Sequence, residues 1–293
     1  MSSWFRVAGA RLAGSTLGDT FMVAYQTRIT GLAAEASFWG IFALPWLILG
    51  LVAGMSHLQG PLGVDAIGTF RGQLIDLADQ VLTPAAIDQF LTPLLDSLLT
   101  GRSPLGLIGV VVAIWAGSRV IDALVTGMTI VYRREGLRSF VLSRLVSLTV
   151  YVGGLVGLIV AIPLIVAGPT FLARLVPGTS GTFAQVLLVA AQVAIVLVLV
   201  VSLFHWSVPH RTPWLADVPG AVLSMALWVV FSWALRWYFS WLFREGSVYA
   251  AISAPIAVMY WVYVTCLALL LGAAFNGALA VRRGWFTPPT MGG

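Results

Sequence analysis

Two ionisable side chains stand inside a long apolar run of this sequence, and they are the first candidates for chemistry. Residues 104–131 read PLGLIGVVVAIWAGSRVIDALVTGMTIV, a length and composition typical of a membrane-spanning helix. Arg119 and Asp122 interrupt the run three positions apart, which on a helix places both side chains on one face. A charge at the centre of a span costs about 2.5–3.5 kcal/mol on insertion scales, so we expect this pair to face protein or a water-filled cavity.

The Arg119–Asp122 pair has two interpretations. In the first, the guanidinium of Arg119 binds an anionic headgroup or ion in a cavity and Asp122 orients it. In the second, the two charges neutralise each other and fix the packing of helices. A guanidinium offers five N–H donors, more than one aspartate ordinarily uses, which keeps the binding interpretation open. Three further residues are candidate members of the same polar interior, although a helix–helix hydrogen bond or an interfacial ion pair explains each of them as well: Glu35, Tyr132 and Asn276.

A basic cluster follows the apolar run, formed by Arg133, Arg134, Arg138 and Arg144. Such a cluster can recruit anionic lipid headgroups. Membrane topology is the ordinary explanation for it, because arginine and lysine concentrate in cytoplasmic loops. We therefore expect these four arginines to contact lipid headgroups and to set the membrane topology.

Catalysis and metal binding have little support in the sequence. The histidines, His57, His205 and His210, are scattered along the chain without a carboxylate cluster beside them. Nucleic-acid cleavage needs a metal cluster or an acid–base pair in a wet cleft. We therefore expect no catalytic residue, no metal site and no cofactor.

Composition indicates that the elements which position these residues are membrane helices. Hydrophobic residues make up 59% of the chain and charged residues only 9%, with a mean hydropathy of +0.97, whereas a soluble domain carries about 25% charged residues. The net charge of +5 is assigned to cytoplasmic loops and not to nucleic-acid binding. The single cysteine, Cys266, excludes an internal disulfide. Residues 1–15 lack a continuous apolar region, so we do not expect a cleaved signal peptide.

Apolar periodicity predicts an all-α, polytopic membrane protein that forms a single integral membrane domain over residues 1–293. Six transmembrane helices are expected at 37–56, 104–131, 141–166, 183–204, 218–243 and 248–280. Residues 1–36 are predicted to form a cytoplasmic amphipathic segment with an N-terminal helix, either in the headgroup layer or as a cap on the bundle. Residues 57–103 are predicted to form an extracytoplasmic amphipathic helical hairpin, in which Pro93 kinks or restarts the second helix.

The distribution of arginine predicts the orientation. One side of the six-span topology receives Arg6, Arg11, Arg28, Arg133, Arg134, Arg138, Arg144, Arg211, Arg282 and Arg283. The other side receives Arg71, Arg102, Arg174, Arg236 and Arg244. Because basic residues favour the cytoplasmic side, we expect a protein of the inner membrane with both termini in the cytoplasm.

Three stretches carry a family resemblance: residues 32–51 (LAAEASFWGIFALPWLILGL), 114–145 and 208–276. The most specific feature is Trp115-x-x-Ser118-Arg119 in the second stretch, followed by Tyr132 and a basic exit. Together they resemble the YihY/BrkB family of bacterial inner-membrane proteins, historically labelled ribonuclease BN-like. The resemblance covers nearly the whole chain outside 57–103. The family pattern G-A-E-x-N has Ala274 at its carboxylate position in this chain, while Asn276 is retained.

The resemblance implies a six-span inner-membrane protein. It does not imply one activity, since members of the family have been linked to envelope integrity and serum resistance. The ribonuclease label finds no support in the residues. The leading hypothesis is transport or translocation of a lipid, an amphiphile or an anion through a cavity that contains Arg119. The alternative is a non-transporting scaffold for envelope assembly. The expected partners are membrane lipids and, for the scaffold, envelope-assembly proteins; nucleic acid is not expected.

Overall fold

A computed structural model describes residues 15–57, 72, 75, 88–89, 92–99, 104–134, 137–155, 181–209, 213–242 and 250–285. These residues form helices and turns and contain no strand, which confirms the predicted all-α fold. The elements are α2 (Thr16–Gln26), α3 (Ile29–His57), α7 (Thr92–Leu99), α8 (Pro104–Val131), the helix Phe140–Leu155, α10 (Gly181–Ser207), the 3₁₀ helix η2 (Trp214–Asp217), α11 (Val218–Leu242) and α12 (Ala250–Arg282).

The long helices have the length and composition of membrane spans. Four apolar windows can cross a membrane: Ile114–Val131, Val189–Ser207, Trp214–Ser240 and Ile256–Arg282. Two shorter apolar segments, Ile29–Leu44 and Phe140–Leu155, fall on the predicted first and third spans. The chain is thus a polytopic helical membrane protein. In α10, for example, the valines at 186, 189, 193 and 196 are exposed, as expected of a helix that faces lipid.

The N-terminal boundary differs from the sequence expectation. α3 begins at Ile29, before the predicted start of the first span at Ser37. A turn at Thr27–Arg28, with Arg28 at a φ of 51°, separates it from α2. Ile29, Ala33 and Ala36 are buried at helical spacing, so packing extends the helix toward its N-terminus. Residues 1–14 of the predicted amphipathic segment lie outside the described residues.

The predicted hairpin at 57–103 is described mainly through α7. Pro93 lies in the first turn of α7, where proline is tolerated. Leu95 is buried and Asp96 is exposed, as the amphipathic pattern requires. Most of the hairpin's first helix, and the second half of the predicted third span, lie outside the described residues.

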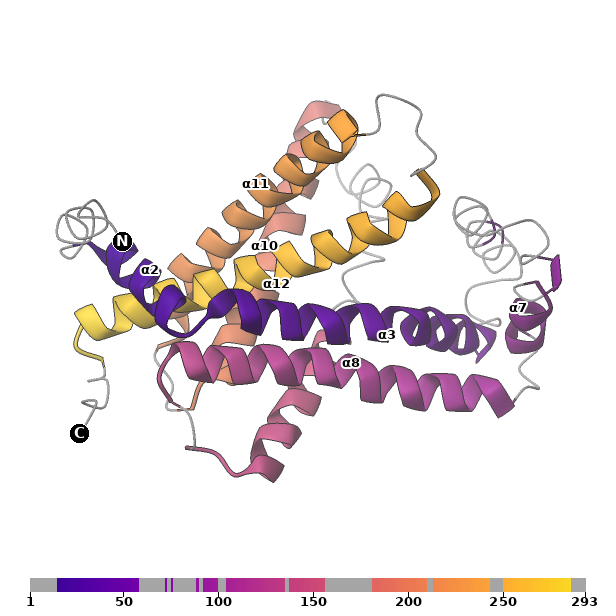
Figure 1. Cartoon of the computed structure of the whole chain (residues 1–293), viewed down its shortest axis with the longest axis horizontal. Coiled ribbons are helices and arrows are strands. Elements are labelled where there is room, and N and C mark those ends of the chain that lie inside the picture. The colour runs from indigo at the N-terminus through magenta and orange to yellow at the C-terminus, as the bar shows by residue number, and fades with distance from the viewer. Residues whose placement is uncertain are drawn as a thin grey trace. The chain divides into compact units, whose positions relative to one another are not determined.

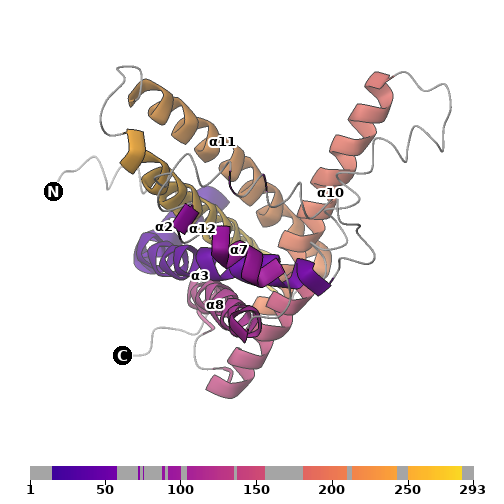
Figure 2. The ribbon, with the colours of Figure 1, turned by 90° about the vertical axis from the view of Figure 1, so that its right-hand side faces the viewer.

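The chain divides into two compact units. Unit 1 comprises residues 1–35, 121–231 and 264–293, and unit 2 comprises residues 36–120 and 232–263. In unit 2, the later part of α3 lies beside the earlier part of α8 (Figures 1 and 2). In unit 1, α10 and α11 converge at η2 (Figure 2).

In unit 1, α11 and α12 cross closely at two glycines. A Cβ atom at Gly220 would overlap the carbonyl oxygen of Gly272 and the side chain of Asn276. A Cβ atom at Gly272 would overlap Ser224 and the carbonyl oxygen of Gly220. Small residues let helix backbones approach closely where no hydrophobic force drives helices together in lipid. Gly272 and Asn276 are four positions apart in α12, so both lie on the face of α12 that meets Gly220.

Candidate functional site

Arg119 lies in unit 2, inside the apolar window of α8, and two tryptophans surround its guanidinium. The Cζ atom of Arg119 lies 5.2 Å from the ring centroid of Trp39 and 5.9 Å from that of Trp115. Trp115 precedes Arg119 by one helical turn, and Trp39 comes from α3. Cation–π contacts of this kind contribute about 0.5–2 kcal/mol, the larger value where water is excluded. The rings therefore stabilise a cation where the membrane itself does not.

The position of Trp39 is fixed by other aromatic rings. Its ring meets Trp115 edge to face at 6.1 Å, Phe42 at 6.0 Å and Phe38 at 5.6 Å, measured between centroids. Edge-to-face pairs at such separations are favourable. Trp115 is 46% exposed, so one side of this aromatic cluster is accessible from outside the protein.

Asp122 lies in unit 1, and its carboxylate contacts the helix that follows α8. A guanidinium nitrogen of Arg144 lies 3.4 Å from Oδ2 of Asp122, and the hydroxyl of Ser147 donates to Oδ1 at 3.0 Å. Arg144 and Ser147 lie on one face of the helix Phe140–Leu155. Asp122 therefore joins two neighbouring helices. Its predicted role in orienting Arg119 stays a prediction.

A second polar cluster forms in unit 1 where Tyr132, His205, Asp217, Gly220 and Asn276 meet, and we call it the polar end. Asn276 of α12 accepts a hydrogen bond from the backbone N–H of Gly220 at 2.7 Å and donates one to the carbonyl of Asp217 at 2.8 Å. Gly220 lies in the first turn of α11, where backbone N–H groups have no partner within their own helix. Asn276 thus caps α11 from a different helix.

The carboxylate of Asp217 is buried at the polar end and lies 3.3 Å from Nδ1 of His205. Tyr132 follows the end of the α8 span, and its ring packs next to Gly277 of α12. Burial raises the pKa of the Tyr132 phenol well above its ordinary value of 10.0, and the negative charge of Asp217 raises that pKa further. The amide of Asn276 acts on the same pKa in the opposite direction. A neutral phenol beside a carboxylate is the stable arrangement here.

Besides Arg144, two more of the predicted basic residues contact other elements in the described structure. The guanidinium of Arg138 donates to the carbonyls of Ser207 at 2.8 Å and Trp206 at 3.3 Å, at the C-terminal end of α10. Arg133 donates to Oε1 of Gln26 in α2 at 2.6 Å. Arginine at a helix C-terminus satisfies free carbonyls and opposes the negative end of the helix dipole. Arg138 therefore has a structural use, and its expected contact with headgroups stays a prediction.

The end of α8 has an unusual residue in its terminating turn. The N–H of Arg134 bonds to the carbonyl of Thr129, the N–H of Arg133 bonds to that of Ile130, and Arg133 has a φ of 53°. α12 ends in the same pattern, with Gly284 at a φ of 69° in the corresponding position. Glycine is usual there, and another residue pays about 1–2 kcal/mol for the left-handed conformation. Strain of this kind at a non-glycine residue motivates a functional hypothesis for Arg133.

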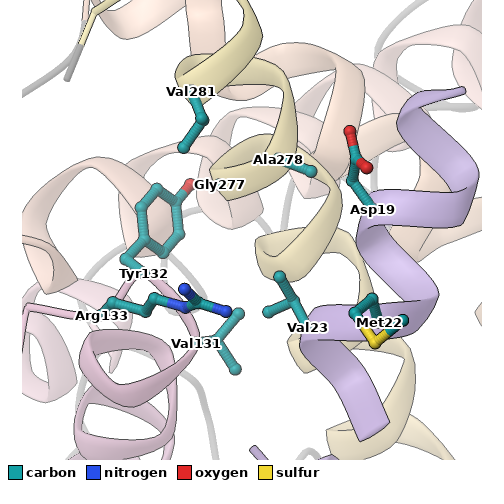
Figure 3. A pocket seen from close by; sticks show the side chains of 9 residues that line it. All are labelled: Asp19, Met22, Val23, Val131, Tyr132, Arg133, Gly277, Ala278 and Val281. Atoms are coloured by element: carbon teal, nitrogen blue, oxygen red, sulfur yellow. The ribbon is translucent and has the colours of Figure 1, made fainter. Parts of the chain in front are cut away.

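A cavity of about 190 Å³ opens in unit 1 between α2, the end of α8 and α12. Figure 3 shows Arg133 extending from the end of α8 toward α2, the ring of Tyr132 under α12, and Asp19 on α2. The other lining residues are Met22, Val23, Val131, Gly277, Ala278 and Val281. Oδ2 of Asp19 also accepts from Nε of Arg282 at 2.6 Å. The lining is therefore mainly apolar, with one acid, one guanidinium and one phenol.

The structure brings Tyr132 and Asn276 together at the polar end, and it leaves Glu35 exposed near the start of α3. Sequence reasoning did not identify Asp217, Asp19 or Gln26 as site residues. Asp217 follows His205 by 12 residues, in the segment between the spans expected at 183–204 and 218–243. Only this short separation could have indicated that the two side chains lie close together. In the described part of the chain, His, Cys, Asp and Glu side chains form no group of three that could hold a metal.

Comparisons with known proteins give relatives that cover part of the chain. The chain is 28% identical over 181 residues to the ribonuclease-like protein YfkH of Bacillus subtilis, covering 60% of this chain and 66% of YfkH. It is 28% identical over 101 residues to a UPF0761 membrane protein of Stenotrophomonas maltophilia, covering 34% of this chain and 24% of that protein. A UPF0761 membrane protein of Xanthomonas campestris is 25% identical over 101 residues, covering 34% and 23%. The chain thus aligns with less than two thirds of each of these relatives.

No solved structure matches the chain. A family model described as virulence factor BrkB matches residues 20–288, which include all of unit 2, most of unit 1 and every helix described above except the first turn of α2. The match confirms the resemblance inferred from the residues around Trp115, Arg119 and Tyr132. This chain belongs to the BrkB family of membrane proteins.

Proposed function

We propose that this protein translocates an anionic amphiphile, with a membrane lipid as the first candidate, across the bacterial inner membrane. The observation that carries the proposal is the guanidinium of Arg119 beside Trp39 and Trp115 within an apolar window of α8. An ionisable residue at this depth is expensive and ordinarily marks a path for a substrate or ion. Arg119 is the residue that meets the anionic group of the substrate.

The chemistry of the aromatic cluster supports this role. A cation–π contact engages the face of a guanidinium, whereas phosphate and carboxylate groups accept hydrogen bonds from its edge. The tryptophans can therefore hold Arg119 while an anionic headgroup binds it. The exposed part of Trp115 offers an apolar surface to the hydrocarbon chain of the same amphiphile.

The polar end supports an orientation for the proposal. Arg133, Arg134 and Arg138 follow the end of α8, Arg282 is the last residue of α12, and Arg283 follows it. We assign this end to the cytoplasm because basic residues concentrate there. The proposed substrate would belong to the cell envelope, and movement past Arg119 would connect the two leaflets.

Lipid mass spectrometry on protein extracted in native nanodiscs tests the proposal. The variants are Arg119→Gln and, as a matched control, Arg283→Gln, which removes another guanidinium that lies 5.0 Å from a tryptophan ring but follows the last span. We expect an anionic lipid that is enriched with the wild type and with Arg283→Gln and is reduced about tenfold with Arg119→Gln, since hydrogen bonds to charged groups contribute about 1.5–3 kcal/mol.

The enriched lipid is then reconstituted with each variant, and its transfer between leaflets is measured with a fluorescent derivative. Slower transfer with Arg119→Gln alone supports translocation. Equal lipid content and equal transfer in all three proteins would overturn the proposal. Arg119 would then be a packing residue, and the scaffold hypothesis with envelope-assembly partners would lead.

A further inference from the structure

The cavity under α2 has the size of a headgroup and not of a whole ligand molecule. Its volume is about 190 Å³, whereas pockets for drug-sized ligands have about 300–1,000 Å³. A lipid headgroup fits this volume when its acyl chains remain outside.

The polar lining offers one partner for a negative group and one for a positive group. Arg133 supplies a guanidinium from the end of α8, and Asp19 supplies a carboxylate from α2 (Figure 3). The side chain of Asp19 is 40% exposed, so it is accessible to a ligand while it contacts Arg282. A guanidinium binds phosphate oxygens in its fork geometry, and a carboxylate accepts hydrogen bonds from an ammonium group. The pair is therefore complementary to a zwitterion.

The backbone at Arg133 supports a role for its side chain. The residue occupies a left-handed position that Gly284 occupies in the equivalent turn of α12. A glycine at 133 would end α8 with less strain. The arginine at this position extends toward α2 and lines the cavity.

The face of α2 that points away from the cavity indicates how deep the cavity lies in the membrane. Leu17, Phe21 and Tyr25 recur at intervals of four residues and are 63%, 66% and 74% exposed. Such a stripe on a short helix fits the boundary between headgroups and acyl chains. The cavity also lies where two spans, Ile114–Val131 and Ile256–Arg282, end. Both observations place it at the level of lipid headgroups.

We propose that this cavity binds the headgroup of an amine-bearing phospholipid, with the phosphate at Arg133 and the ammonium at Asp19. Phosphatidylethanolamine has the required chemistry. Phosphatidylcholine is disfavoured because its quaternary ammonium has no N–H to donate to Asp19, and phosphatidylglycerol has no cation. The cavity and Arg119 share no residue, so this site stands whether or not Arg119 takes part in translocation.

Lipid competition in nanodiscs tests the site. Full-length protein is reconstituted with equal amounts of phosphatidylethanolamine, phosphatidylcholine and phosphatidylglycerol, and the lipids that survive a detergent wash are measured by native mass spectrometry. We expect phosphatidylethanolamine to be retained about tenfold over phosphatidylcholine. Asp19→Asn should abolish this preference, and Arg133→Gln should lower retention of every phospholipid.

Two matched controls remove the protein partners of Asp19 and Arg133 and leave these two side chains in place. Arg282→Gln removes the partner of Asp19 but keeps its carboxylate, and Gln26→Ala removes the partner of Arg133 but keeps its guanidinium. Both controls should retain phosphatidylethanolamine. A loss of retention equal to that of Asp19→Asn or Arg133→Gln would mean that the contacts only hold α2 in place, and the proposal would fail.

Arg133→Gly separates binding from folding. Relief of the left-handed strain should raise Tm while lipid retention falls. Soluble phosphoethanolamine, added in place of lipid, distinguishes a lipid from a free zwitterion. A higher Tm of the protein with the soluble compound, without retention of the lipid, would overturn the assignment. Equal retention of the three phospholipids by the wild type would do the same. Intact headgroup preference in Arg119→Gln shows that the two sites are independent.

Discussion

The polar end of unit 1 and the aromatic cluster of unit 2 hold their polar side chains in different ways. At the polar end, Asn276 bonds to the backbone where α11 begins, and Arg138 bonds to the backbone where α10 ends. In unit 2, the guanidinium of Arg119 contacts the aromatic rings of Trp39 and Trp115. The first arrangement joins side chains to helix termini, whereas the second joins a side chain to other side chains in mid-helix.

This difference separates structural from functional use of polarity in a membrane. Helix termini leave N–H and C=O groups that need partners, so polar residues beside them have a structural use. Backbone groups in mid-helix are already bonded within the helix. The backbone of α8 does not require a charge such as Arg119, which agrees with the ligand-binding role proposed for this residue.

The largest effect is expected at the glycine crossing of the polar end. Gly220→Ala places a methyl group against the carbonyl of Gly272 and the side chain of Asn276. We expect a loss of about 1–3 kcal/mol or more, because overpacking forces the helices apart. Thermal unfolding in detergent measures it. Gly31→Ala is the control, since a Cβ there meets nothing within 4 Å; equal Tm values for both variants would contradict the close crossing.

Removal of the cap on α11 should have the next largest effect. Asn276→Leu leaves the N–H of Gly220 and the carbonyl of Asp217 without their present partner, which costs about 1–3 kcal/mol when such groups are buried. Thr265→Val is a matched control, because it breaks an exposed hydrogen bond between the same two helices, from Trp228 to Thr265. A larger decrease in Tm for Thr265→Val than for Asn276→Leu would contradict the distinction between polar residues at helix ends and those in mid-helix.

The sign of the stability change should reverse between the two regions. Arg138→Leu removes a cap on α10 and should lower stability by about 0.3–1 kcal/mol. Arg119→Leu removes a mid-span charge and should leave Tm unchanged or raise it, because the insertion penalty of the guanidinium disappears. Both variants are compared in the same detergent. A marked loss of Tm for Arg119→Leu would assign Arg119 to packing.

The smallest effect is a pH dependence at Tyr132. The folded state raises the pKa of this phenol above 10.0, so its contribution to stability is complete below that pH. As pH rises above 10, the unfolded state releases the proton while the folded state retains it, and the contribution is lost. Tyr132→Phe should therefore lose less Tm between pH 9 and pH 11 than the wild type. Tyr25→Phe, at an exposed tyrosine, should behave like the wild type.

The sequence predicted the later spans closely because long apolar runs define them. The expected spans 183–204, 218–243 and 248–280 correspond to α10, α11 and α12. The start of α3 was predicted less well, since residues 29–36 are helical through buried small residues and not through a continuous apolar run. The amino-acid composition gives no signal for the division into two compact units, because α3, α8, α11 and α12 each contribute residues to both.

Site residues were harder to predict than spans. Spacing alone placed Arg119 and Asp122 on one face of a helix. It did not indicate that Trp39 contacts Arg119 or that Arg144 pairs with Asp122, because both partners come from other helices. Asn276 was recognised as a polar residue in an apolar stripe. Its partners, Gly220 and Asp217, contribute backbone groups, and backbone groups leave no signal in an amino-acid sequence.

The cap that Asn276 provides has a consequence for biosynthesis. Its partners precede it by 56 and 59 residues, so a ribosome has already released η2 and the start of α11 when Asn276 is made. During that interval the first turn of α11 lacks this partner, and the last helix completes it on entering the membrane. The arrival of α12 thus completes the cap, and we expect nascent chains arrested before residue 276 to be more susceptible to added protease near η2 than the complete chain.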